Sequence, residues 1–357
     1  HACGAGTGSG ACIREIGGVM IRTPAFWHRP GPGLRAKLLA PLGRLYGAAT
    51  ARAMAERGLD VGVPVITIGN FVAGGAGKTP TAIAIAHLLD SLGEMPAFLT
   101  RGYGGAPPFE AVAVTDQSAR VVGDEPLLLS RVAPTFVGPM RVRAAHLALK
   151  TVRPSVLVGD DGLQSRAIEP ALAIAVVDGQ TGIGNNLCVP AGPLRAPLAD
   201  QIAHVDALVL VGSGEAGETV AAQVEARGKP CFYADLEPTP SARALAGERV
   251  IAFAGLGMPE KFFHMLEQLG ARVIATRSFG DHHAYRPREI ARLQARARAE
   301  GAMLVTTEKD FVRLPPASGG PRPRAIGVEL VFHDERSVCQ FLSAGLARAK
   351  RNQRRQV

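Results

Sequence analysis

The chain has 357 residues, which is enough for two folded lobes at about 150 residues per domain. Hydrophobic residues make up 47% and charged residues 20% of the sequence, which excludes a disordered or collagen-like chain. Aromatic residues make up only 5%, which argues against a nucleic-acid binder that works by base stacking. The five cysteines are scattered without a CxxC pair. This spacing excludes a disulfide-dense scaffold and a recognisable zinc site, and it favours a reducing compartment.

The formal net charge of +9 is concentrated at the two ends of the chain. Residues 1–60 carry eight Lys and Arg against three Asp and Glu, and the last ten residues carry five Lys and Arg with no acidic residue. Basic ends of this kind fit an anionic membrane surface or nucleic acid. For the basic tail at residues 346–357, simple solvation explains the charge equally well.

Residues 1–19 are rich in Gly and Ala and lack the apolar run of a signal peptide. We expect them to be a disordered or non-native extension before a natural start at Met20. Within residues 20–60, four leucines recur at helical spacing and predict an amphipathic helix: Leu34, Leu38, Leu42 and Leu45. No run here reaches the ~20 apolar residues of a membrane-spanning helix. The leucine stripe lies either in a membrane interface or against the protein's own core, and this segment alone does not separate the two.

A phosphate-binding loop follows the first predicted strand. Residues 63–68 read as a short buried strand, residues 69–77 are rich in glycine, and residues 80–92 read as a helix. Strand, glycine-rich loop and helix form a P-loop, in which backbone N–H groups and the helix N-terminus face phosphates. Lys78 is placed to reach the β- and γ-phosphates, and Thr79 to give its hydroxyl to Mg²⁺. Val72 stands where the strict pattern has glycine, but the core GGAGKT is intact.

A second predicted strand, at residues 156–160, ends in the carboxylates Asp160 and Asp161. This is the Walker B arrangement, in which a buried strand brings Asp to Mg²⁺ beside the phosphate loop. Two aspartates at a strand end also occur as a turn or a helix N-cap. The P-loop upstream favours the metal role.

Phosphoryl transfer also needs a base and a cation for the transferring group. Asp124 and Glu125 precede a helical stretch and are either candidate acids or capping residues. The DHH cluster at residues 281–283 offers a general base, a metal ligand or an oriented surface pair. Arg195 follows a rigid PAGPL turn and either stabilises phosphoryl charge or is an ordinary surface arginine.

The predicted fold class is α/β. Residues 61–240 alternate strands with helices and predict a P-loop NTPase-like, mostly parallel sheet flanked by helices. A linker at residues 237–240 leads to a second, smaller α/β lobe at residues 241–345. This lobe has predicted strands at 250–254, 273–274 and 303–307 and predicted helices at 259–269 and 287–300.

These motifs occur together, in this order, in the tetraacyldisaccharide 4′-kinases of lipid A biosynthesis, which the chain resembles from about Phe26 to Leu314. Any one matching stretch is weak evidence, but the ordered set is highly specific. The main stretches are GGAGKTP at 74–80, RGYGG at 101–105, GDEPLL at 123–128, DDGLQ at 160–164, PAGPLR at 190–195, DHHAY at 281–285 and TTEKD at 306–310.

The resemblance implies a kinase that uses ATP and Mg²⁺ to phosphorylate the 4′-hydroxyl of a tetraacyl disaccharide 1-phosphate. It also implies a peripheral or monotopic enzyme on the cytoplasmic face of the bacterial inner membrane, with the leucine-rich helix on an anionic lipid surface. We expect no nucleic-acid partner, and no protein partner is evident.

The resemblance also assigns roles to individual residues. It implies that Asp124 is the base with His282 as its partner, and that Lys78 and Arg195 stabilise the transferring phosphoryl group. Metal contacts are implied for Thr79, Asp160, Asp161 and Glu125, and substrate contacts for Asn70, Arg101, Tyr103 and Gln164. Nucleotide contacts are implied for the loop and its flanks: Gly74, Gly75, Ala76, Gly77, Lys78, Thr79 and Pro80.

The sequence departs from the family pattern at three secondary positions. Ser165 stands where many members have His, Ala196 where many have Glu, and Gly280 where many have Pro. The alternative enzyme is another P-loop phosphotransferase or ATPase with a soluble substrate. A GTP-regulated factor is a third reading, but of an Asn-Lys-x-Asp motif only Lys309 and Asp310 are present.

Overall fold

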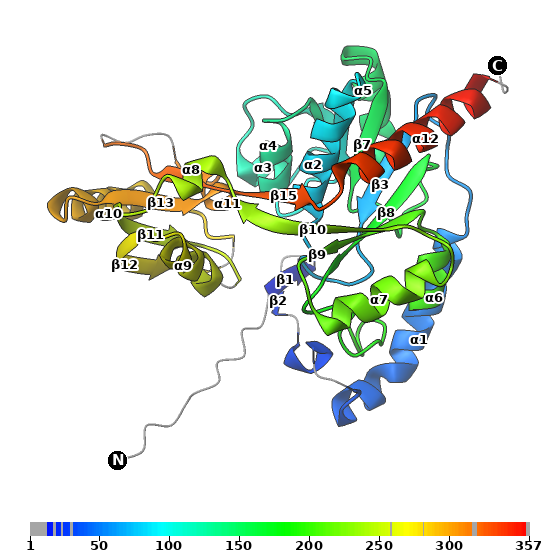
Figure 1. Cartoon of the computed structure of the whole chain (residues 1–357), viewed down its shortest axis with the longest axis horizontal. Coiled ribbons are helices and arrows are strands. Elements are labelled where there is room, and N and C mark those ends of the chain that lie inside the picture. The colour runs from blue at the N-terminus through cyan, green and yellow to red at the C-terminus, as the bar shows by residue number, and fades with distance from the viewer. Residues whose placement is uncertain are drawn as a thin grey trace.

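The computed structural model describes residues 13–16, 19–22, 24–28, 31–257, 259–280, 282–315 and 320–354. Two α/β lobes lie side by side and are joined by a pair of antiparallel strands, β10 (Cys231–Pro238) and β15 (Val328–Phe332) (Figure 1). The predicted α/β class, with a mostly parallel sheet and a smaller second lobe, is confirmed.

The first lobe is built on one sheet, which has nine strands within the described residues, in the order β15-β10-β9-β8-β3-β7-β4-β6-β5. Neighbouring strands are parallel except at the two edges, where β10 pairs with β15 and β5 pairs with β6 in antiparallel fashion. The other strands are β3 (Val65–Gly69), β4 (Pro96–Thr100), β5 (Val112–Ala113), β6 (Thr135–Val137), β7 (Val156–Asp160), β8 (Leu172–Asp178) and β9 (Ala207–Val211).

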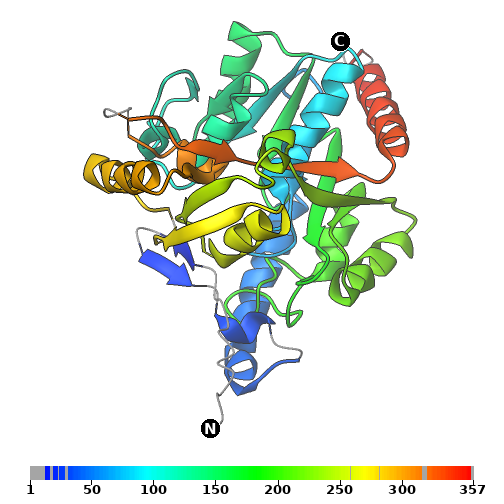
Figure 2. The ribbon, with the colours of Figure 1, turned by 60° about the vertical axis from the view of Figure 1, so that its left-hand side comes forward.

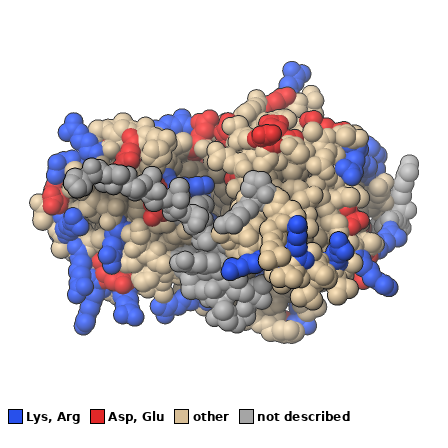
Figure 3. Space-filling view, turned by 90° about the horizontal axis from the view of Figure 1, so that it is seen from below, with Lys and Arg blue, Asp and Glu red and all other residues tan. Residues whose placement is uncertain are grey.

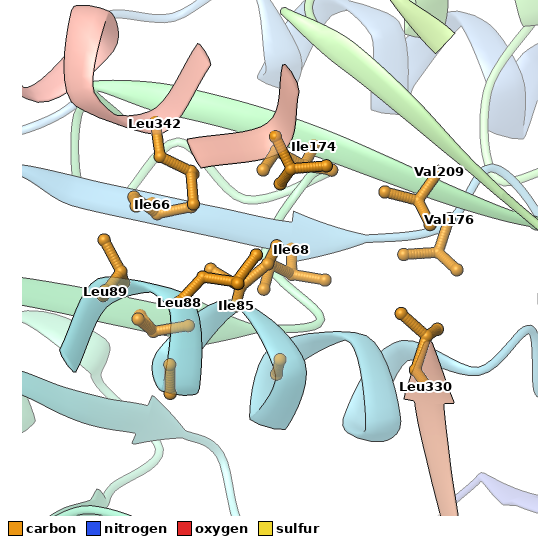
Figure 4. Packing of buried hydrophobic residues seen from close by; sticks show 14 of the residues in the cluster. Ile66, Ile68, Ile85, Leu88, Leu89, Ile174, Val176, Val209, Leu330 and Leu342 are labelled. Atoms are coloured by element: carbon orange, nitrogen blue, oxygen red, sulfur yellow. The ribbon is translucent and has the colours of Figure 1, made fainter. Parts of the chain in front are cut away.

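Alternating side chains of the central strands bury both faces of this sheet. Ile174 and Val176 of β8 pack with α2 (Lys78–Ser91) and α12 (Glu335–Arg354), and Ala173 and Ala175 of the same strand pack toward the opposite face. Figure 4 shows Leu342 of α12 beside this core. The opposite face is covered by α5 (Arg141–Thr151), α6 (Leu198–Ala203) and α7 (Glu215–Glu225). Because both faces are covered, the strands read as nearly continuous apolar runs.

The second lobe has a parallel sheet in the order β12-β11-β13-β14, with α9 and α10 on opposite faces. Val250 and Ala252 of β11 pack toward α9, whereas Ile251 and Phe253 pack toward α10. Its elements are α8 (Pro240–Arg243), β11 (Arg249–Ala254), α9 (Pro259–Gln268), β12 (Arg272–Ser278), α10 (Pro287–Ala299), β13 (Met303–Thr307), α11 (Glu308–Phe311) and β14 (Arg324–Ile326).

The chain returns to the first lobe earlier than the predicted boundary at residue 345. β15 joins the edge of the large sheet, and Val338, Leu342 and Leu346 of α12 belong to its core. Placing residues 328–345 in the second lobe was therefore wrong, and α12 continues through most of the predicted tail. The apolar spacing of this helix does not say which lobe it covers, so sequence alone could not set the boundary.

The predicted N-terminal helix is α1 (Leu34–Met54), which leaves the body of the first lobe at the lower edge in Figures 1 and 2. Its small residues Gly43 and Gly47 are buried against Cys188 and Pro197. Its leucine stripe faces away from the core: Leu34, Leu38, Leu42 and Leu45 are 57–76% exposed. Packing on the core therefore does not explain the stripe. In the described part of the chain, no helix is long and apolar enough to cross a bilayer.

Two short segments precede α1. Strands β1 (Ile13–Ile16) and β2 (Val19–Arg22) pair in antiparallel fashion, so part of the predicted disordered extension at residues 1–19 has strand structure. The remainder of that extension, 1–12 and 17–18, lies outside the described residues. A 3₁₀ helix, η1 (Ala25–His28), follows, and its Trp27 indole donates to the Pro190 carbonyl at 3.0 Å.

Candidate active site

The glycine-rich segment joins the end of β3 to the start of α2, as a P-loop requires. Gly77 caps α2 with φ +83°, a left-handed conformation that favours glycine. A Cβ on Gly74 or Gly75 would meet nothing within 4 Å, so this part of the loop borders open space. The side-chain amide of Asn70 donates to the Gly74 carbonyl at 2.8 Å, which links the start of the loop to its middle.

The first turn of α2 carries the predicted phosphate-binding side chains. Lys78 and Thr79 are both buried, and Pro80 occupies the next position of the helix. The Lys78 ammonium lies 3.4 Å from the Gly74 carbonyl oxygen and 3.8 Å from Oδ1 of Asp161. Ala76, within the loop, is buried. The helix N-terminus and the lysine together place positive charge next to the open side of the loop.

The predicted Walker B strand is β7, and it lies directly beside β3 in the sheet. The register pairs Ile68, near the end of β3, with Asp160, the last residue of β7. Asp160 is buried, and its Oδ1 accepts no hydrogen bond among the described residues. Burial, and then repulsion from Glu125, raises the pKa of the Asp160 carboxyl to about 7. A cation at this oxygen would reverse that effect by favouring the ionised carboxylate.

Asp161 binds cations of the protein itself. Its Oδ2 lies 3.1 Å from Nη2 of Arg195, and its Oδ1 faces Lys78. Arg195 also donates to the Val72 carbonyl and to the Gln164 side chain, each at 3.2 Å. The predicted arginine is therefore not an ordinary surface residue, because it joins the P-loop to the Walker B turn.

The side chains of Gln164 and Gln201 form hydrogen bonds next to the Walker B turn. Gln164 donates to the Asn70 carbonyl and to Oε1 of Gln201, each at 2.9 Å. Gln201 is buried and donates to the Phe71 and Ala196 carbonyls. Gln201 was missed by the sequence analysis, because a lone glutamine in a helix carries no motif.

Arg141, at the start of α5, is a further residue that sequence reasoning missed. Its Nη2 donates to the Asp160 carbonyl at 2.7 Å and to the Asp161 carbonyl at 2.5 Å. Burial and the nearby Arg101 guanidinium lower its pKa to about 10, although it stays protonated at neutral pH. Arg141 therefore holds the backbone of the Walker B turn, where Asp161 adopts φ +53°.

Asp124 begins α4 (Asp124–Leu129) immediately after Gly123, which has φ +88°. A Cβ on Gly123 would lie 2.3 Å from the Tyr103 carbonyl, so the RGYGG loop packs directly against this helix start. Oδ2 of Asp124 lies 2.9 Å from Nδ1 of His282 and 3.1 Å from Nε of Arg313. Both partners come from the second lobe.

The two histidines of the DHH cluster make different contacts. His282, at φ +54°, contacts Asp124, whereas the neighbouring His283 lies 3.0 Å from Glu289 at the start of α10 and stacks on Phe279. His283 therefore belongs to the second lobe's own packing. The remaining member, Asp281, lies outside the described residues.

The other predicted residues line the same region. Glu125 is next to Asp124 and lies 3.5 Å from the Lys309 ammonium of the second lobe. Arg101 and Tyr103 are exposed on the loop that follows β4. A Cβ on Gly104 would lie 3.8 Å from the His282 ring, so this loop borders the histidine.

Oxygen atoms beside the P-loop are of the kind that Mg²⁺ binds. No group of three His, Cys, Asp or Glu side chains that could hold a metal ion occurs among the residues the structure describes. Mg²⁺ prefers oxygen ligands and usually binds through one or two carboxylates together with substrate phosphates. The Asp160 oxygen that accepts no hydrogen bond, with the Thr79 hydroxyl on the adjacent helix start, meets that requirement.

Comparison with known proteins adds to this geometry. A family model described as tetraacyldisaccharide-1-P 4′-kinase matches residues 35–347. The chain belongs to this kinase family. A tetraacyldisaccharide 4′-kinase of Methylobacterium nodulans is 52% identical over 300 residues, which cover 84% of this chain and 89% of that protein. One from a strain of Methylorubrum extorquens is 50% identical over 331 residues, covering 92% of this chain and 100% of that protein.

A solved structure shares the fold of this kinase family member. The crystal structure of LpxK from Aquifex aeolicus in complex with ATP has a TM-score of 0.69 and 27% sequence identity. The match covers 88% of this chain and 100% of the Aquifex chain, so both lobes are shared.

Proposed function

We propose that this chain transfers the γ-phosphoryl group of ATP to the 4′-hydroxyl of a tetraacyl disaccharide 1-phosphate. As a member of the tetraacyldisaccharide 4′-kinase family, it is an ATP-dependent kinase of lipid A biosynthesis. The observation that supports the residue roles is the meeting of two clusters. Lys78, Arg195 and Asp161 form one network, and Asp124, on the helix α4 that contacts α2, pairs with His282. Charge on Glu125 acts on Asp160, so α4 lies within electrostatic range of the Walker B strand.

In this proposal Asp124 accepts the proton of the 4′-hydroxyl while the hydroxyl oxygen attacks the γ-phosphorus. The bond from that phosphorus to the bridging oxygen of ADP breaks, and His282 orients and supports the carboxylate through Oδ2. Lys78 and Arg195 stabilise the charge on the transferring oxygens, since phosphoryl transfer relies mainly on positioning and electrostatics. The loop 74–80 holds the phosphates through its backbone N–H groups.

We propose that Mg²⁺ is held by Asp160 and Thr79. A bound Mg²⁺ supplies charge neutralisation at the β- and γ-phosphate oxygens. Asp161 is engaged by Arg195 and Lys78, so its part is to orient these two cations. Glu125 faces Lys309 and contributes negative charge near Asp160.

Substrate contacts separate into two kinds. The side chains of Asn70 and Gln164 are hydrogen-bonded within the P-loop network, and we propose that they shape the sugar site indirectly, by holding this loop in place. Arg101 and Tyr103 are exposed on the loop that borders His282, and we assign them to contact with the acceptor.

We propose that α1 lies in the interface of an anionic membrane, at the cytoplasmic face of the inner membrane. Its leucine stripe is exposed, and Arg35, Lys37, Arg44 and Arg52 are exposed on the same helix without an ion pair among the described residues. Figure 3 shows Lys and Arg side chains standing out from a mostly uncharged surface on this side of the molecule. Anionic lipids add about 1 kcal/mol of binding per basic residue near the surface. An acyl-chain substrate stays in the bilayer, so an interfacial helix brings the enzyme to it.

The test of the reaction is a product assay in detergent with Mg-ATP and a tetraacyl disaccharide 1-phosphate. A bis-phosphorylated lipid is expected from the wild type and from Lys261→Ala, an exposed control on α9, but not from Lys78→Ala or Asp124→Ala. Steady ATP hydrolysis without a lipid product would contradict the lipid acceptor and favour a soluble one.

The test of the membrane contact is flotation with vesicles of phosphatidylglycerol and phosphatidylethanolamine. A Leu38→Ser/Leu42→Ser variant is expected to lose most vesicle binding while it keeps its activity in detergent. Leu92→Ser, a half-exposed leucine at the end of α2, is the matched control and is expected to bind as the wild type does. Equal binding of all three proteins would contradict the role of α1.

A further inference from the structure

Arg313, just after α11, is a second-lobe residue whose buried side chain reaches the proposed base. Its side chain is only 6% exposed, and its Nε lies 3.1 Å from Oδ2 of Asp124. The same Nε donates to the Lys309 carbonyl at 3.0 Å, and Nη1 and Nη2 lie 3.3 Å from the Gly255 carbonyl oxygen. A guanidinium bound on three sides has little freedom to move, so it presents one fixed edge to Asp124.

Behind Arg313, a buried carboxylate holds the other end of the guanidinium. Asp310 is fully buried and lies 3.3 Å from Nη2 of Arg313. Asp310 accepts hydrogen bonds from the Tyr285 hydroxyl and the Thr307 hydroxyl, each at 2.6 Å, and from the Gly255 amide at 2.9 Å. Burial and the Asp310 charge raise the pKa of Tyr285, so its hydroxyl remains a donor. These donors come from three segments of the second lobe.

The geometry at Asp124 gives its two oxygens different roles. His282 and Arg313 both contact Oδ2, and within the described residues no hydrogen bond reaches Oδ1. Oδ2 is hydrogen-bonded to His282 and lies against the positive charge of the Arg313 guanidinium, so the carboxylate is held through this one oxygen and its second oxygen keeps a fixed direction. A buried carboxylate also needs a compensating cation. Among the described residues, the buried Arg313 guanidinium contacts the Asp124 carboxylate and supplies that charge.

We propose that Arg313 is a positioning residue for Asp124, which it orients from the second lobe so that Oδ1 faces the acceptor hydroxyl. This inference rests on the proposed role of Asp124 as the base. It makes α11 and the residues after it part of the catalytic alignment, because Asp310 and Tyr285 fix Arg313 within the second lobe. Contact between the lobes then sets the orientation of the base.

The experiment measures kcat and KM for Mg-ATP and for the lipid acceptor with the full-length protein in detergent. Arg313→Ala is expected to lower kcat on the order of 100-fold with both KM values little changed, since misplacing a reacting group by about 1 Å costs that much. Arg313→Lys keeps the charge, and its kcat is expected to be at least tenfold higher than that of Arg313→Ala. Arg296→Ala, an exposed arginine on α10, is the matched control and is expected to keep wild-type kcat.

A double variant separates positioning from general stability. If Arg313 acts through Asp124, Asp124→Ala/Arg313→Ala is no slower than Asp124→Ala alone, because residues that act as one unit are not additive. Wild-type kcat in Arg313→Ala, or a multiplicative loss in the double variant, would overturn the inference. Melting curves check folding, and Arg313→Gln replaces Arg313→Ala if the latter fails to melt cooperatively. An active Asp124→Ala would instead overturn the proposed base.

Discussion

The candidate site has a nucleotide half around the P-loop and a base half around Asp124, the proposed base, and the two halves are built in different ways. Lys78, Asp161 and Arg195 all belong to the first lobe, and the ends of adjacent strands bring the first two together. Asp124 belongs to the first lobe as well, but its partners His282 and Arg313 come from the second. The first half is therefore formed by one sheet, whereas the second half exists only where two lobes meet. The first should persist when the lobes separate, and the second should not.

The largest effect is expected in the nucleotide half. Lys78→Ala removes the cation at the P-loop, and we expect kcat/KM to fall on the order of 1,000-fold or more, since such electrostatic stabilisers contribute several kcal/mol. The measurement is initial-rate kinetics of lipid phosphorylation. A loss below tenfold would mean that Arg195 and Mg²⁺ suffice without this lysine.

His282→Ala tests the base half and is expected to cost less, about 10- to 100-fold in kcat, because the carboxylate of Asp124 remains in place. His283→Ala is the matched control, since its ring contacts Glu289 and lies outside the proposed machinery. Single-turnover rates with saturating Mg-ATP distinguish the two. Equal losses in both variants would point to damage of the segment rather than loss of the dyad.

Asp160, in the nucleotide half, is expected to make the stability of the folded protein depend on pH. Its pKa is raised to about 7, so without Mg²⁺ the folded state binds a proton there that the unfolded state, with a carboxyl pKa near 4, releases. This group therefore favours folding at low pH, and its contribution is lost as pH rises through about 7. Asp160→Asn should be more stable than the wild type at pH 8 in EDTA, by at least about 1 kcal/mol, and the gain should shrink toward pH 5. Urea unfolding at both pH values measures the difference, and a constant gain would contradict a raised pKa.

The smallest effect is expected at the exposed edge of the base half. Lys309 and Glu125 form an ion pair that is partly open to solvent, and such pairs contribute about 0–1 kcal/mol. Lys309→Ala should change kcat by less than about fivefold and lower the melting temperature only slightly. A loss as large as that expected of Arg313→Ala would make the whole contact between α11 and α4, not the buried arginine, the determinant of alignment.

The site residues that sequence could not find have a common cause. Arg141, Gln201 and Arg313 act through backbone carbonyls or through a partner far along the chain, so no spacing pattern marks them. A weak signal did exist for Arg313, because it follows Asp310 by three residues, a spacing at which side chains in a helical turn are neighbours. The predicted boundary of the second lobe was wrong for a similar reason, since the apolar face of α12 fits either sheet.

The sequence by itself determined the P-loop, the Walker B strand end, the α/β class and the leucine stripe, because each depends on residues that are neighbours in a strand, loop or helix. Only the tertiary structure decided that the stripe faces away from the core and that His282, not His283, meets Asp124. It also placed the buried side chain of Arg313 next to Asp124. Local periodicity carries no information about which lobe surface covers a helix face or where two lobes touch, since those contacts depend on packing between segments far apart in the chain.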